Sequence, residues 1–94
     1  MILSNDFKIA CEIYKAELNQ EPIWFTKLTE ILYGKIGKTI ISDSLDALSD
    51  YGIVRYVYGA TNTGCVAGLL YICDEHKNRI KIIYDAHYSK CYSK

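Results

Sequence analysis

Two residues near the C-terminal end have the spacing of a metal-binding pair. His87 and Cys91 are four residues apart, so that on a helix they share one face and suit two ligands of one ion. His76 precedes them by about three helical turns, which is too far to join them. Cys65 and Cys73 would lie roughly 26 Å apart along one straight strand. Because no four-ligand set closes within one chain, we predict neither a bound metal nor another cofactor.

Motifs of common enzyme classes are absent from the chain. There is no glycine-rich phosphate loop, because Gly34 and Gly37 have the spacing of ordinary turn glycines. Neither HExxH nor GxSxG occurs. We therefore expect a protein that is not an enzyme.

A second polar set lies between residues 39 and 50 and has helical spacing. Its members would gather on one face of a helix, opposite an apolar stripe. The polar residues are Thr39, Ser42, Asp43, Asp46, Ser49 and Asp50, and the stripe is Ile41, Leu45 and Leu48. Thr39 suits the N-cap of this helix, and Gly52 suits its C-terminal end.

Two further helices are expected before this one. The first begins near Asn5 and ends near Gln20, where Pro22 interrupts the chain. Thr26 can cap the second helix, which ends close to Gly34. A short extended pair, Ile23-Trp24, separates the two.

A β-hairpin and a last helix are predicted after Gly52. Residues 53–58 are rich in β-branched and aromatic side chains, residues 59–64 (GATNTG) form a turn-rich tip, and residues 65–73 return as a second strand. Asp74 can cap the last helix. On this helix, one face collects His76, Ile80, Ile83, Tyr84, His87 and Cys91.

Composition limits the class of protein. The 94 residues predict a single domain, 1–94, that is α+β but mainly helical. No apolar run is long enough to span a membrane, and the start, MILSNDFK, does not have the pattern of a signal peptide. The four cysteines form no CxxC pair, which favours reduced thiols and a cytoplasmic location.

The order of these elements resembles that of small archaeal and bacterial winged helix-turn-helix regulators of the MarR/ArsR-like type. The resemblance depends on LTEIL, the turn after it, and TIISDSLDALSDYGIV, with Leu48, Gly52, Ile53 and Val54 as its most family-like part. It implies a three-helix core, a two-stranded wing and a C-terminal helix. It also implies a DNA-binding transcriptional regulator, with its third helix in the major groove of double-stranded DNA and its wing on the backbone.

Matched position by position, the resemblance assigns possible DNA contacts. On the third helix these are Thr39, Ser42, Asp43 and Asp46; before it, Lys35 and Lys38; and on the wing, Arg55 and Asn62. Thr39 and Ser42 would bond to phosphates or bases, and the lysines to phosphates. The carboxylates depart from the family, which usually places a cationic or neutral donor at the position of Asp43.

An alternative function remains open on the same sequence. The chain has as many Lys and Arg as Asp and Glu, 11 of each, whereas a nucleic-acid-binding protein is usually basic on at least one face. The tip GATNTG carries no charge, and phosphates repel the carboxylates of the third helix. A winged helix that binds other proteins, without direct DNA contact, is therefore the second hypothesis.

The stripe on the last helix predicts a homodimer. We expect Ile80, Ile83, Tyr84, His87 and Cys91 to meet a second copy of the chain, because helices one to three and the hairpin already supply a core. Packing of this stripe on the first helix of the same chain is the alternative.

Overall fold

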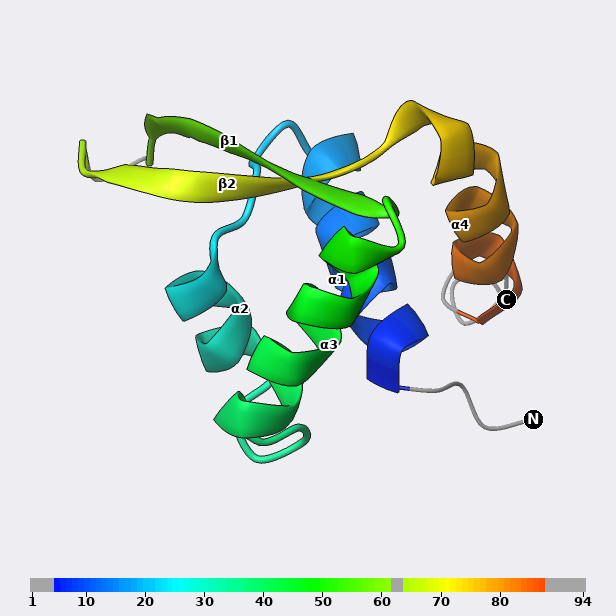
Figure 1. Cartoon of the computed structure of the whole chain (residues 1–94), viewed down its shortest axis with the longest axis horizontal. Coiled ribbons are helices and arrows are strands. Elements are labelled where there is room, and N and C mark those ends of the chain that lie inside the picture. Colours follow the sequence, from blue (N-terminus) through cyan, green and yellow to red (C-terminus); the bar gives the residue numbers. More distant parts are fainter. Residues whose placement is uncertain (1–4, 62–63, 88–94) are drawn as a thin grey trace.

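The computed structural model describes residues 5–61 and 64–87, which form four helices and one hairpin (Figure 1). The fold is α+β and mainly helical, as predicted from the sequence. The elements in chain order are α1 (Asn5–Leu18), α2 (Phe25–Ile31), α3 (Lys38–Asp50), β1 (Val54–Ala60), β2 (Val66–Ile72) and α4 (Asp74–His87).

One hydrophobic core joins the four helices and the base of the hairpin. Its fully buried side chains include Ile9, Ile13, Leu28, Ile41, Leu70, Ile72 and Ile80. The predicted stripe of α3 is confirmed, because Ile41, Leu45 and Leu48 are all buried. Leu18, the last residue of α1, is more than half exposed.

The hairpin is a two-stranded antiparallel sheet with a third, very short partner. Val54 pairs with Ile72 at its base and Ala60 with Val66 near its free end. The N–H of Leu70 donates to the carbonyl of Ile23 at 2.7 Å, so the predicted extended pair before α2 adds an edge bridge to β2. This bridge ties the hairpin to the segment that connects α1 and α2.

Two helices begin earlier than their threonines predicted. Helix α2 begins at Phe25 after an extended Trp24, and α3 begins at Lys38 after an extended Gly37; neither end has a side-chain cap. Thr39 is therefore not an N-cap but lies within the first turn of α3. At the other end Gly52 has φ 73°, and the N–H of Ile53 donates to the carbonyl of Leu48 at 2.9 Å, which confirms the glycine C-terminus.

Helix α4 packs on α1, which corrects part of the predicted dimer surface. Ile80 is fully buried in the core of its own chain, so it cannot meet a second copy in this conformation. The rings of Tyr84 and Tyr14 lie edge to face with centroids 5.4 Å apart. Ile83 is half-buried, whereas the large apolar residue that α4 exposes is Ile82, at 70%. The His87 side chain and Cys91 lie outside the described part of the chain.

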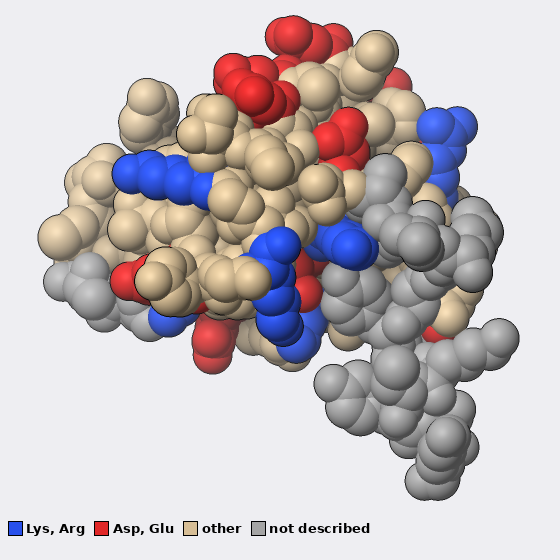
Figure 2. All heavy atoms as spheres, turned by 90° about the horizontal axis from the view of Figure 1, so that it is seen from below, with Lys and Arg blue, Asp and Glu red and all other residues tan. Residues whose placement is uncertain are grey.

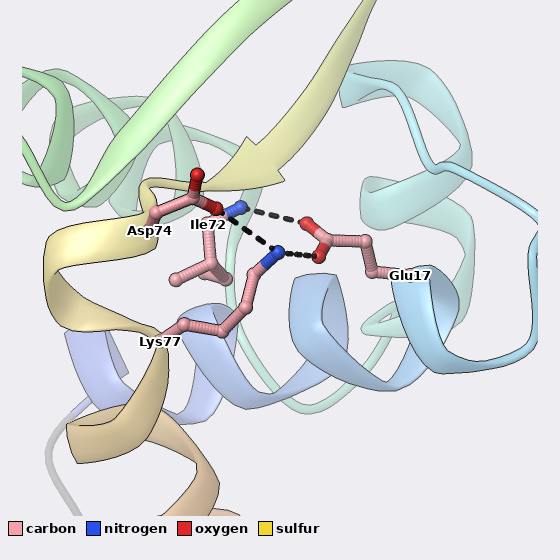
Figure 3. A network of polar contacts seen from close by, with 4 residues as sticks. All are labelled: Glu17, Ile72, Asp74 and Lys77. Carbon is pink, nitrogen blue, oxygen red and sulfur yellow. Dashed lines mark hydrogen bonds and ion pairs between the residues drawn. The ribbon is translucent and has the colours of Figure 1, made fainter.

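A small polar network joins α1, β2 and the start of α4 (Figure 3). The carboxylate of Glu17 accepts from the backbone N–H of Ile72 at 2.9 Å and from Lys77 Nζ at 2.8 Å. Lys77 Nζ also lies 3.3 Å from Asp74. The hydrogen bond that Lys77 donates to Glu17, more than any other contact, raises the pKa of Lys77. Glu17 thus satisfies an N–H on the edge of β2 and fixes the hairpin base against two helices.

Among residues 5–61 and 64–87, no helix is both long enough and apolar enough to cross a bilayer.

Candidate nucleic-acid interface

The outer face of α3 is polar. Opposite its buried stripe, Thr39, Ser42, Asp43 and Asp46 are all exposed, as the periodicity predicted. These four side chains lie within two turns of one helix and offer two hydroxyls and two carboxylates. The structure therefore brings together the four α3 residues assigned from the sequence.

An open hollow of about 790 Å³ lies at the turn between α2 and α3. Lys35 and Lys38 line it, together with Tyr33 from the end of α2. Gly34 has φ 80°, which lets the chain reverse direction here, and the N–H of Ile36 donates to the carbonyl of Leu32 at 3.0 Å. The two predicted lysines therefore lie beside the first turn of α3.

The N-terminus of α3 opens at the same place. Its first N–H groups receive no side-chain cap. These groups carry part of the positive end of the helix dipole, which favours an anion. The two lysines and this helix end together form the part of the candidate interface that suits a phosphate.

The two faces of the hairpin differ in their relation to α3. Val54 is buried in the core, and Tyr56, two residues further on the same face, lies near Asp46 of α3. Burial, and secondarily the charge of Asp46, raises the pKa of Tyr56. Arg55 belongs to the opposite face, where its guanidinium lies 5.2 Å from the centroid of the Tyr71 ring.

The predicted wing residues are thus not gathered beside the predicted helix residues. Arg55 is exposed, but it points away from the hairpin face that carries Tyr56. Asn62 lies outside the described residues. The described parts of the two strands carry no charged residue other than Arg55.

Two exposed tyrosines also belong to this surface, and the sequence pattern had assigned them no role there. Tyr33 in the hollow is 87% exposed, and Tyr58 on the hairpin is 83% exposed. Tyr33 lies after the end of α2 and immediately before Gly34, so it is not part of the apolar face of that helix. An aromatic residue beside a turn glycine was the signal in the sequence that could have pointed to it. Such rings can stack or donate a hydrogen bond.

Charges of both signs are interspersed on the described surface. Seen from below, several Lys and Arg side chains lie close together near the centre of the view with Asp or Glu beside them, and others lie apart; Asp and Glu lie near the upper edge and also at the lower left (Figure 2). Among the described residues that this view shows, no continuous basic surface forms. The cationic part of the interface is therefore local, at the α2–α3 turn, and not a broad field.

Metal chemistry finds no support in the described residues. No group of three or more His, Cys, Asp and Glu side chains comes together there. Cys11 is buried in α1, and Cys65 lies exposed just before β2.

Comparison with known proteins adds a fold class. A PadR-like transcriptional regulator from Bacillus cereus has 15% sequence identity and a TM-score of 0.64, over 93% of this chain and 86% of that one. A protein assigned as a transcriptional regulator from Thermoplasma acidophilum has 19% identity and a TM-score of 0.59, with the same coverage. No protein-family model matches the chain, and no curated protein matches it.

The chain therefore has the winged-helix fold that these two proteins share. At such low identities the likeness defines the fold, and the function has to be argued from the residues. The narrower likeness to MarR- and ArsR-type regulators stays a prediction.

Proposed function

We propose that this chain is a DNA-binding transcriptional regulator. In this proposal α3 lies in the major groove and the hairpin contacts the neighbouring backbone. The observation that carries it is the exposed polar face of α3, with Lys38 at the first position of the helix and Lys35 in the turn before it. That the two fold neighbours are described as transcriptional regulators supports the same assignment.

Each contact follows from the chemistry of its side chain. Lys35 and Lys38 bind phosphates, as point charges beside the N-terminus of α3. Thr39 and Ser42 hydrogen-bond to phosphates or base edges, and Asp43 and Asp46 accept from cytosine amino groups in the major groove.

The hairpin supplies the remaining contacts. Arg55 and Asn62 bind the backbone beside the groove. Because Arg55 lies on the hairpin face away from α3, its contact is the one most sensitive to how the hairpin sits on the duplex.

Binding as a homodimer completes the proposal. The end of α4, with Ile83, Tyr84, His87 and Cys91, forms the two-fold contact. A two-fold dimer repeats α3 at a spacing that suits successive major-groove turns. Light scattering should give a dimer mass for the wild type and a monomer mass for a folded Ile83→Asp/Tyr84→Ala variant; a monomeric wild type contradicts this part.

Paired charge variants test the DNA contact. On a labelled duplex, Lys38→Ala should weaken binding to all sequences alike and lower the salt slope by about one per chain of the dimer. Lys81→Ala is the control, since this exposed lysine pairs with Asp85 on α4 at 3.1 Å. Asp43→Asn should strengthen non-specific binding, whereas Asp85→Asn should not. If the two variants of each pair change DNA binding equally, α3 does not contact the DNA.

The carboxylates favour a second function, a winged helix that binds another protein. Asp43, Asp46 and Asp50 are exposed together and suit a basic partner better than a phosphate backbone. If a folded wild-type chain binds no duplex at low salt, this function gains support. A partner that is recovered with the wild type and lost with Asp43→Lys/Asp46→Lys would identify it.

A further inference from the structure

A groove runs between the hairpin and the helical body, away from the outer face of α3. Its volume is about 670 Å³, which is within the range of small-molecule sites. One side is the second half of α1 with the connection to α2, and the other side is β2 with the end of β1. In Figure 1 the hairpin extends over α2, on the side where the groove lies.

The groove is lined by both aliphatic and aromatic side chains. Ile23 and Leu69 are nearly fully buried, and they lie beside the half-buried rings of Trp24 and Tyr71. Ile31 at the end of α2 contributes an apolar side chain that is 44% exposed. An exposed isoleucine beside two aromatic rings leaves apolar area that a ligand would remove from water.

The backbone around the groove is fixed. The bridge between Ile23 and Leu70 joins the segment before α2 to β2 beneath the groove. Leu69 lies close over Gly59, where an added Cβ would stand 2.9 Å from Leu69 Cδ1. The glycine therefore lets Leu69 lie against β1, which keeps its side chain low in the groove.

Charges at the mouth of the groove cancel. Glu12 and Glu21 are matched by Lys15 and Lys27 among the lining residues. Such a rim favours neither an anion nor a cation, while the aromatic side chains favour a flat ring.

We propose that this groove is a binding site for an uncharged, planar aromatic small molecule. The molecule stacks between Trp24 and Tyr71, above Ile23 and Leu69. The site is separate from the proposed DNA interface, and its occupant touches both the hairpin and the helical body.

Trp24 makes the proposal measurable without a label, because it is the single tryptophan of the chain. The probe is N-phenylnaphthylamine, an uncharged dye that emits strongly only in apolar surroundings. We expect a saturable rise in its emission with one dye per chain, sensitised by excitation of Trp24. In Trp24→Phe, compared at dye concentrations that saturate the site by directly excited emission, the sensitised emission is lost.

Two matched pairs of variants locate the dye. Ile31→Glu places a charge in the groove and should weaken dye binding about tenfold or more. Ile40→Glu, at a site of similar exposure (47%) on α3, should leave dye binding unchanged. Tyr71→Ala should weaken binding, whereas Tyr58→Ala should not. The second pair decides the matter if a glutamate variant fails to fold, which a thermal melt reveals.

A third comparison tests the ligand class. Anilinonaphthalene sulfonate, which adds a negative charge to the same ring system, should bind more weakly than the neutral dye. The proposal is overturned by non-saturable emission, by equal losses within the tyrosine pair, or by tighter binding of the sulfonate. No readout involves DNA, so the result is independent of whether the chain binds DNA.

Discussion

Removing the carboxylate of Glu17 should destabilise the fold more than removing its cationic partner. Glu17→Ala leaves the N–H of Ile72, a fully buried residue, without its acceptor. An unsatisfied buried donor costs about 1–3 kcal/mol. The ion pair adds less, about 0–1 kcal/mol, because the Lys77 side chain is 40% exposed and solvent screens it.

These magnitudes give an order for three variants. Glu17→Ala should lower the free energy of unfolding by about 2 kcal/mol, from the orphaned N–H together with the lost ion pair. Glu17→Gln keeps an acceptor for Ile72 and should lose about 1 kcal/mol. Lys77→Ala leaves the bond between Glu17 and Ile72 in place and should lose less than about 1 kcal/mol.

Urea unfolding at neutral pH measures all three changes. Lys81→Ala is the matched control, because it breaks the more exposed ion pair with Asp85 and frees no backbone group. The double variant Glu17→Ala/Lys77→Ala should be scarcely less stable than Glu17→Ala alone. If Lys77→Ala destabilises the chain as much as Glu17→Ala does, the ion pair and not the backbone bond dominates, and the reasoning is wrong.

Three further predictions concern stability. Gln20 has φ 59°, so Gln20→Gly should raise the free energy of unfolding by about 1 kcal/mol, whereas Gln20→Ala should bring no such gain; equal changes would exclude strain as the cause. Conversely, Gly52→Ala should lower the free energy of unfolding by about 1 kcal/mol, because Gly52 has φ 73°; an unchanged urea midpoint would contradict this. Burial raises the pKa of the Cys11 thiol from 9.0 to about 11, so that the unfolded chain ionises first as pH rises. Stability present below pH 9 should therefore fall by about 2–3 kcal/mol towards pH 11, and Cys11→Ala should flatten this dependence.

Local patterns predicted those parts of the fold that depend on local physics. The stripe of α3 and the glycine end at Gly52 both follow from residues within one helix, and both are confirmed. The starts of α2 and α3 were predicted wrongly, since Trp24 and Gly37 precede them without any side-chain cap. A threonine near a helix start is thus a weaker signal than the extended backbone before it.

Contacts between distant segments were beyond the reach of such patterns. Periodicity found the apolar stripe of α4 but not what covers it, and in the structure Ile80 is covered by the core of its own chain. The hydrogen bond between Glu17 and Ile72 joins residues 55 positions apart, so no local pattern in the sequence predicts it. Arg55 lies on the hairpin face away from α3 because side chains alternate along a strand. Predicting this would have required knowing which face of the hairpin packs on the core.

The most direct test of the proposed function is the salt dependence of wild-type binding to a labelled duplex. If Lys35, Lys38 and Arg55 of both chains in a dimer bind phosphates, the logarithm of affinity should fall linearly with the logarithm of salt concentration. The expected slope is about −5, because about 0.9 counterions are released per phosphate contact. A folded wild-type chain that binds no duplex at low salt, or binds with an affinity independent of salt, would contradict the account.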